Sequence, residues 1–196
     1  MAEPALNLGA ILLAAGESSR LGQPKQLLKS ARWSNLALVR RQAELLLKKN
    51  FSAVVVVTGS SNSAVEAELD GLPVQLCHNE NWKKGMGTSI ACGIRAMPER
   101  VRGALVLLCD QWQIVDADLQ NLCDEWTQHP TSAVISIWTD SSGPPTIFPR
   151  VLFDPLARLN GNKGARRVLS RFTGEVRYLT VDNAAYDIDV ASDIPD

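Results

Sequence analysis

Short apolar runs alternate along the chain with segments whose apolar side chains recur every three or four residues. The runs are rich in branched aliphatic residues, and they occupy residues 8–14, 53–58, 73–77, 103–109, 133–138, 146–148 and 176–180. Such runs are typical of strands that are buried on both faces of a sheet. Between two of them, the spacing of Leu36, Val39, Ala43 and Leu46 is that of one face of a helix. Alternating strands and helices predict an α/β fold, a three-layer sandwich around a largely parallel sheet.

Polar and turn-forming residues indicate where several elements begin or end. Asn35 and Asp116 are expected to cap helices, and Ser63 with Glu66 forms the pattern of a capping box. The run Gly143-Pro144-Pro145 predicts a turn before the short apolar run that follows it.

Length and composition limit the classes of protein that fit. No repeat or linker divides the chain, so residues 1–196 are expected to form one domain. Charged residues make up 21% of the chain and the net charge is −1, with no basic run, so neither a nucleic acid nor a membrane is an expected partner. The absence of a long apolar stretch and of a basic signal-like start favours a cytoplasmic location.

The cysteines and histidines show no spacing typical of a metal site or a catalytic triad. Cys77, Cys92, Cys109 and Cys123 form no C-x-x-C pair and lie mostly within apolar or helical patterns. Buried thiols are therefore expected rather than a zinc site or disulfides. The two histidines share no spacing with a nucleophile and an acid, which argues against a histidine-based triad.

A loop rich in small residues follows the first expected strand, over residues 14–25. Small residues let backbone N–H groups approach a polyanion closely, and Arg20 and Lys25 add two cations that could neutralise phosphate oxygens. Pro24 fixes the backbone just before the lysine. An ordinary turn is the alternative, but it does not explain these three residues together. The loop has neither the P-loop nor the G-x-G-x-x-G pattern, which argues against a P-loop ATPase and a dinucleotide-binding dehydrogenase.

Two further segments place candidate chemistry at the carboxyl ends of expected strands, where ligands bind in open α/β sheets. Asp110 directly follows the run 103–109, and a carboxylate there is either a Mg²⁺ ligand or a turn residue. Residues 79–94 lead from a glycine-containing loop into a helix whose first turn holds Thr88 and Ser89. That helix start either binds an anionic or polar ligand or is simply capped.

Residues 12–25 resemble the signature loop of nucleotidyltransferases with a glycosyltransferase-A-like fold, roughly L-A-[AG]-G-x-S-x-R-[ML]-G-x-x-K. The Ala-Ala-Gly form with Ser18 is closest to the molybdenum-cofactor cytidylyltransferases, whereas guanylyltransferases more often have Ala-Gly-Gly. Residues 79–94 resemble the family's N-x-x-[WY]-x-x-G-[ML]-x-x-S-[IL]-x-x-G-[IL], which contributes to its base and ribose pocket. The resemblance implies a mostly parallel mixed sheet. It also implies nucleotide-binding residues at Leu13, Ala14, Ala15, Gly16, Ser18, Ser19, Arg20, Lys25, Gly59, Asn79, Gly85 and Ser89.

A Mg²⁺ site is a second implication of this resemblance. The family carries Asp-Gln-Pro where this chain has Asp110-Gln111-Trp112, and it uses that Asp for the metal. Residues 187–193 resemble its D-x-D-T-P-E-D ending, which makes Asp189 the second expected ligand and Asp187 a less favoured one. The catalytic residues are then expected to be Arg20, Lys25 and Asp110.

Two other segments resemble parts of the family that lie near its second substrate. Residues 143–148 match G-x-P-x-x-[FI], and residues 161–166 match G-D-x-G-A-R with Asn162 in place of the Asp. The implied function is Mg²⁺-dependent transfer of CMP from CTP to a phosphorylated acceptor such as molybdopterin, with release of pyrophosphate. A guanylyltransferase that uses GTP, or a sugar-phosphate nucleotidyltransferase, is an alternative within the same fold.

The alternative from a different class of protein is a module that binds a nucleotide or a cofactor but catalyses no reaction. The chain departs from the family pattern at Trp112, Asn162, Val190 and Ala191. Retention of Lys25, Asp110 and Asp189 argues against a mere binder, which has less use for a pair of metal ligands. The tryptophans are expected to pack in the core, and Trp112 is the one candidate for stacking on a base.

Overall fold

The structure is a computed structural model, and it describes residues 7–139, 141–161 and 164–194. The strands are β1 (Leu8–Leu13), β2 (Val54–Thr58), β3 (Gln75–His78), β4 (Gly103–Leu108), β5 (Ala133–Trp138), β6 (Ser141–Pro149) and β7 (Val176–Thr180). The α-helices are α1 (Leu38–Leu47), α2 (Asn62–Glu68), α3 (Met86–Arg95), α4 (Asp116–Gln128), α5 (Phe153–Ala157) and α6 (Arg166–Leu169). Short 3₁₀ turns occupy Lys25–Leu27, Ala31–Trp33, Trp82–Lys84, Arg150–Leu152, Asp182–Ala185 and Ala191–Asp193.

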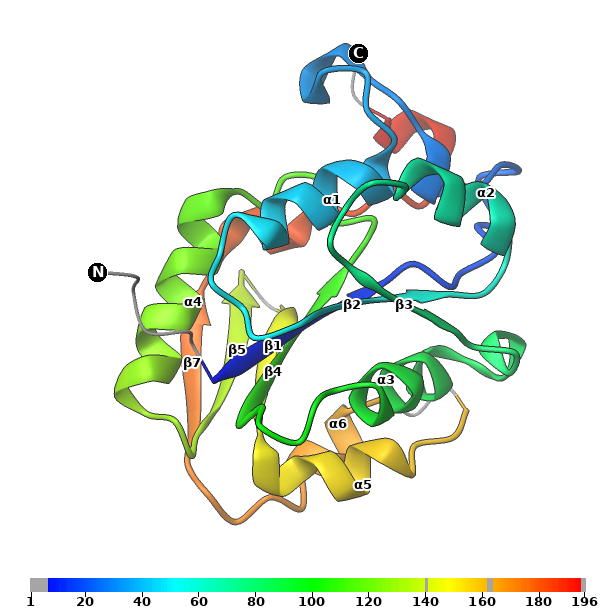
Figure 1. Ribbon diagram of the computed structural model, residues 1–196. Helices are drawn as coiled ribbons and strands as arrows, with labels where there is room; N and C mark the ends of the chain where they lie inside the picture. Colours follow the sequence, from blue (N-terminus) through cyan, green and yellow to red (C-terminus); the bar gives the residue numbers. More distant parts are fainter. Residues whose placement is uncertain (1–6, 140, 162–163, 195–196) are drawn as a thin grey trace.

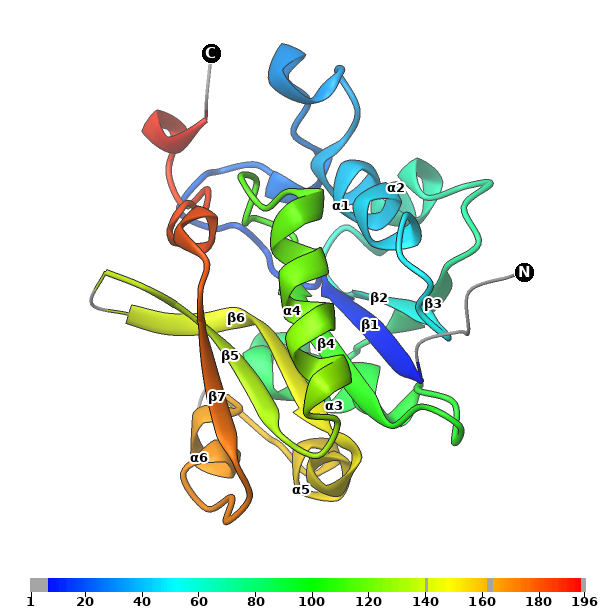
Figure 2. The ribbon, with the colours of Figure 1, turned by 90° about the vertical axis from the view of Figure 1, so that its left-hand side faces the viewer.

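The described strands form one mixed sheet in the order β3-β2-β1-β4-β6-β5-β7. The pairs β3–β2, β2–β1, β1–β4 and β5–β7 are parallel, and β6 runs antiparallel to both of its neighbours. Helices α1, α2 and α4 cover one face of this sheet, and α3, α5 and α6 cover the other (Figures 1 and 2). The expected three-layer α/β sandwich with a mostly parallel sheet is confirmed.

Strand β1 is buried on both faces, which explains its continuous apolar sequence. Leu8, Ala10 and Leu12 pack into the cluster beneath α1 and α4, whereas Ile11 and Leu13 pack into the cluster above α3 and α5. Each side chain points to the opposite face from the one before it, because the period of a strand is two residues. A charged residue within β1 would therefore have no exposed face to occupy.

The sheet brings the candidate site together at its carboxyl edge. Leu13 at the end of β1 lies in register with Leu108 at the end of β4. The loop that follows β1 and Asp110 that follows β4 therefore leave the sheet side by side. The segment after β7 returns to the same edge, where the N–H of Ile188 donates to the carbonyl oxygen of Asp110 at 3.2 Å.

Several predicted boundaries are wrong. The residue that precedes α1 is Ala37 instead of Asn35, which has a left-handed φ of 56°. Ser61 precedes α2, so no capping box begins at Ser63, and Asp116 is the first residue of α4 rather than its cap. The shifts are one or two residues, which is the usual uncertainty of a helix end.

Residues 143–145, which were expected to form a turn, lie inside β6, and β6 pairs with β5 in antiparallel orientation. Prolines fit there because the pairing of β6 with β5 shifts register between Ile135 and Ser136. No helix in the described part of the chain is long and apolar enough to cross a membrane.

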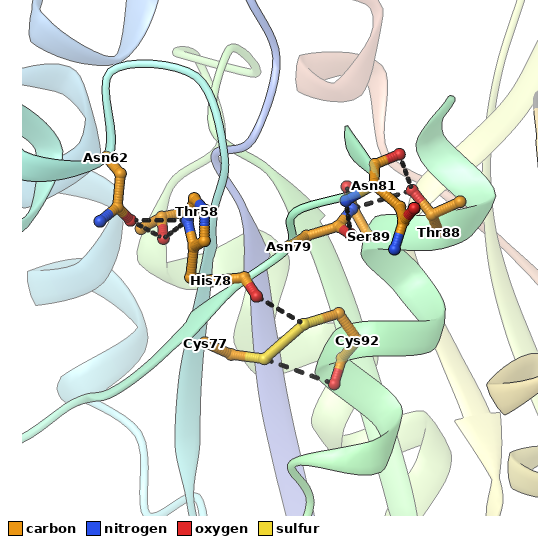
Figure 3. Close-up of a disulfide and its surroundings, with 9 residues drawn as sticks. All are labelled: Thr58, Asn62, Cys77, His78, Asn79, Asn81, Thr88, Ser89 and Cys92. Atoms are coloured by element: carbon orange, nitrogen blue, oxygen red, sulfur yellow. Dashed lines mark hydrogen bonds between the residues drawn. A yellow bond between two sulfur atoms is a disulfide. The ribbon is translucent and has the colours of Figure 1, made fainter. Parts of the chain in front are cut away.

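The prediction for the cysteines is half right. Cys109 and Cys123 are buried thiols, and burial raises the pKa of Cys123 to about 12. Cys77 at the end of β3 and Cys92 on α3 form a disulfide instead (Figure 3). Helix α3 packs against β3, so two cysteines that are 15 residues apart in sequence become neighbours in space.

Candidate functional site

A cleft of about 350 Å³ opens at the carboxyl ends of β1 and β4. One wall is the loop after β1, and the opposite wall is the segment that leads into α3. The floor is formed by residues 108–110 and by Asp189. The cleft is therefore built from the two segments whose motifs resemble the nucleotidyltransferase family.

The loop after β1 presents a row of unused backbone donors. Among the described residues, no acceptor takes a hydrogen bond from the backbone N–H groups of residues 15–20. Ser18 turns the loop with a φ of 57°, and its hydroxyl oxygen accepts from the N–H of Lys25 at 3.1 Å. Successive free N–H groups on a turn form a concavity that binds anions. The loop is thus arranged to receive phosphate oxygens.

Gln26 holds this loop from behind, and the sequence analysis missed it. Its side chain is 2% exposed, and its Nε2 donates to the carbonyl oxygens of Ala14 at 2.9 Å and Gly16 at 2.7 Å. These bonds turn two carbonyl groups of the loop toward Gln26. A polar residue between Lys25 and the pair Leu27-Leu28 was the available signal.

Lys25 lies between two acids at the centre of the cleft. Its Nζ is 2.7 Å from Asp110 and 3.2 Å from Asp189, and Arg20 forms a second ion pair with Asp189 at 3.0 Å. Burial lowers the pKa of Lys25, but the ion pairs with Asp110 and Asp189 outweigh it and leave the pKa above its usual value. Lys25 is therefore a permanent cation at neutral pH.

Three carboxylates converge at this point. Asp110, Asp187 and Asp189 each offer an oxygen, and these oxygens lie within 4.8 Å of one another. Burial, together with the charges of Asp110 and Asp189, raises the pKa of Asp187 above its usual value. Asp110 also has a buried oxygen, Oδ1, without a hydrogen-bond partner among the described residues.

This carboxylate group fits a small divalent cation. Hard cations such as Mg²⁺ and Mn²⁺ are bound by carboxylate oxygens, and the unpaired Oδ1 of Asp110 is an open acceptor in the group. Asp110 and Asp189 are brought together as expected. Asp187, which the sequence favoured less, belongs to the same group.

The opposite wall is formed by Trp82, Lys83, Gly85, Met86 and Ser89. Lys83 stacks over the ring of Trp82, with its Nζ 5.3 Å from the ring centre. Met86 is 47% exposed, so this wall offers apolar and aromatic surface to a planar group. Of these residues, Gly85 and Ser89 were predicted, and the other three were not.

Three of the expected nucleotide-binding residues lie behind the cleft and not on it. Ala14 faces the α1 side of the sheet and is buried. Gly59 packs so closely against Ala15 that an added Cβ would lie 2.7 Å from the carbonyl oxygen of Ala15. Asn79 is 5% exposed and donates to Ser89 at 2.9 Å, as Figure 3 shows, so it positions that hydroxyl. The remaining expected residues of the nucleotide site line the cleft.

Trp112 does not lie in the cleft, so the structure does not place it where it could stack on a base. Its ring packs against Trp33, with ring centres 6.0 Å apart. On the expected acceptor side, Arg166 donates to the carbonyl oxygen of Ser142 at 3.2 Å. Asn162 lies outside the described residues.

The sheet order and the loop after β1 are those of the glycosyltransferase-A-like nucleotidyltransferase fold. The chain belongs to the family of MobA-like NTP transferase domains, whose model matches residues 10–176. The Purine catabolism protein PucB of Bacillus subtilis is 30% identical over 171 residues, which cover 81% of this chain and 78% of PucB.

A solved structure of Rv0371c from Mycobacterium tuberculosis is 29% identical to this chain, with a TM-score of 0.83. The match covers 97% of this chain and 96% of that one. A structure of Rv0371c in complex with manganese is also similar, at 26% identity and a TM-score of 0.77, with 95% of each chain covered.

Other relatives match only part of their own length. The Nicotine blue oxidoreductase of Paenarthrobacter nicotinovorans is 37% identical over 102 residues, which are 52% of this chain and 48% of that protein. The chain spans 23% of the Bifunctional IPC transferase and DIPP synthase of Rubrobacter xylanophilus, at 36% identity. The names of these relatives differ widely, so membership of the family does not fix the substrate.

Proposed function

We propose that this protein is a nucleotidyltransferase that transfers CMP from CTP to a phosphorylated small molecule, a molybdopterin-like pterin being the first candidate, and releases pyrophosphate. One observation carries the proposal. A loop whose backbone N–H groups have no acceptor among the described residues carries two cations that contact a group of three carboxylates in the same cleft. A nucleoside triphosphate with a divalent cation is a ligand that satisfies both groups at once.

The chain's own residues would act by binding and orientation. The N–H groups of residues 15–20 and the guanidinium of Arg20 would receive phosphate oxygens, and Gln26 would keep the loop in shape. Lys25 would hold a positive charge close to the triphosphate. A phosphate oxygen of the acceptor would attack the α-phosphorus, and pyrophosphate would leave. An ionised acceptor phosphate needs no general base.

Asp110, Asp187 and Asp189 would hold the divalent cation, with Mg²⁺ as the proposed ion. When bound, this cation neutralises charge on the triphosphate.

The preference for CTP rests on Ala15. Ala15 is one of the residues that line the cleft, it is 5% exposed, and Gly59 packs closely against it. The methyl group therefore narrows the space for a purine. A change of one methyl group in a pocket discriminates by only about 1–3 kcal/mol, so we expect a partial preference. Ala15→Gly should bring the kcat/KM values for GTP and CTP closer together without abolishing the use of CTP.

The test is pyrophosphate release with Mg²⁺ and each of the four nucleoside triphosphates, with and without a phosphorylated pterin. We expect release with CTP that depends on the acceptor. Release that prefers GTP would contradict the choice of base, and release with a sugar phosphate instead of the pterin would contradict the acceptor. Tight binding of a triphosphate without any release would favour a binding module.

A further inference from the structure

A second hollow runs along α5, away from the cleft. One compartment of about 690 Å³ lies between α5 and α6, and another of about 280 Å³ lies between α3 and the residues that follow α5. Arg158, Leu159 and Asn160 line both compartments, so the two adjoin along this segment, and we refer to them together as the groove. Neither compartment shares a lining residue with the cleft. Figure 1 shows α3, α5 and α6 side by side on this face of the sheet.

The groove is strongly basic. The charged residues that line it, among those the structure describes, are all cations, namely Lys84, Arg95, Arg158, Arg167 and Arg171. None of the five forms an ion pair within the described part of the chain. The whole chain has a net charge of −1, so this concentration of unpaired cations is local. Like charges gathered on one surface favour an occupant of opposite charge.

The larger compartment also has an apolar surface. Leu152, Val168 and Phe172 line it, and Val151 at its edge is 68% exposed. An inorganic ion would neutralise the cations but would leave this apolar surface in water. The groove therefore fits a ligand that carries negative charges and apolar side chains together.

We propose that this groove binds an acidic, partly apolar segment of a partner protein. Its carboxylates would lie against Arg158, Arg167 and Arg171, and its apolar side chains would cover Val151 and Phe172. A nucleic acid fits less well, because single strands bind on stacked aromatic rings and the described lining of the groove holds one aromatic residue, Phe172. This proposal does not depend on the nucleotidyltransferase activity.

The test uses a labelled random copolymer of glutamate and tyrosine as the probe, with the intact protein. We expect saturable binding that weakens at least tenfold between about 50 and 300 mM salt, because the contacts are largely ionic. The triple variant Arg158→Glu, Arg167→Glu, Arg171→Glu should lose at least 20-fold in affinity.

A matched control reverses the same number of charges outside the groove. The control variant Lys48→Glu, Arg100→Glu, Arg102→Glu should keep the affinity within threefold, and circular dichroism should show both variants folded. An equal loss of affinity in the two variants would overturn the proposal, because the change in net charge alone would then explain the loss.

The apolar part of the proposal has its own test. Val151→Gln changes a side chain that is 68% exposed, so the fold should tolerate it. We expect the affinity for the glutamate–tyrosine copolymer to fall about fivefold and the affinity for polyglutamate to stay the same. Equal binding of the two polymers, tighter binding of single-stranded RNA, or binding of inorganic phosphate alone would each overturn the proposal.

Discussion

Replacement of Lys25 by methionine should tighten the binding of a divalent cation and weaken the binding of a nucleotide. In the structure, the ammonium group of Lys25 lies 2.7 Å from Asp110 and 3.2 Å from Asp189 and so occupies the space between the carboxylates. A cation that binds these acids must displace or share those contacts. Lys25→Met removes the competing charge but keeps most of the volume of the side chain.

The size of the effect follows from the contacts that Lys25 makes. A hydrogen bond to a charged group contributes about 1.5–3 kcal/mol. The Lys25 and Asp110 side chains are 15% and 18% exposed, so their bond should count nearly in full. The bond to Asp189 is discounted, because that side chain is 36% exposed and screened by solvent. We therefore expect the free energy of Mn²⁺ binding to become more favourable by about 2–3 kcal/mol. This change lowers the Kd for Mn²⁺ roughly 30- to 150-fold.

Calorimetric titration with Mn²⁺ and then with CTP in the presence of Mn²⁺ measures both effects. Lys83→Met is the matched control, because Lys83 lines the same cleft but stacks on Trp82 and has no carboxylate partner among the described residues. It should leave the Kd for Mn²⁺ unchanged. Weaker binding of Mn²⁺ by Lys25→Met, or equal changes in both variants, would refute the reasoning that Lys25 competes with the cation.

Three further predictions concern single features of the site and its frame. Gln26→Met should raise KM for the nucleotide about tenfold while the far-ultraviolet circular dichroism stays unchanged, because it removes both hydrogen bonds that shape the loop; an unchanged KM would remove Gln26 from the site. Because the pKa of Asp187 is raised in the folded chain, ionisation of this carboxyl costs more free energy in the folded than in the unfolded chain. The folded state therefore loses stability as the pH rises from the pKa of Asp187 in the unfolded chain through its higher pKa in the folded chain. Asp187→Asn should thus raise Tm in metal-free buffer at pH 7, and a lower Tm would contradict the assigned repulsion. Cys77→Ser should lower the free energy of unfolding by about 2–3 kcal/mol under oxidising conditions, and an equal loss in wild type after reduction would confirm that the disulfide is the cause.

Local patterns were sufficient for much of the cleft. The loop with Arg20 and Lys25, and Asp110 after an apolar strand, were predicted because each depends on a few consecutive residues. The sequence also contained the information that Ala14 faces away from the cleft. Side chains alternate along the strand, so Leu12 and Ala14 face one side of the sheet and Leu13 and Ala15 face the other. The family pattern names the whole loop as nucleotide-binding and so hides this alternation.

Features that depend on contacts between distant segments were not predicted. Gln26 bonds to Ala14 and Gly16 only because the chain folds back after the loop. The disulfide joins cysteines on β3 and α3 whose spacing has no motif. Asp187 was predicted only as a less favoured ligand, and it joins the carboxylate group because the segment after β7 returns to β4, a contact that no local pattern contains.

The fate of the α-phosphate tests the proposed activity most directly. CTP labelled at the α-phosphorus and, in a parallel reaction, at the γ-phosphorus would be incubated with the protein, Mg²⁺ and a phosphorylated pterin. We expect the α label in the acceptor product and the γ label in pyrophosphate, with both signals lost in Asp110→Asn. Transfer of the γ label to the acceptor, or bound CTP that stays intact, would contradict nucleotidyl transfer at this cleft.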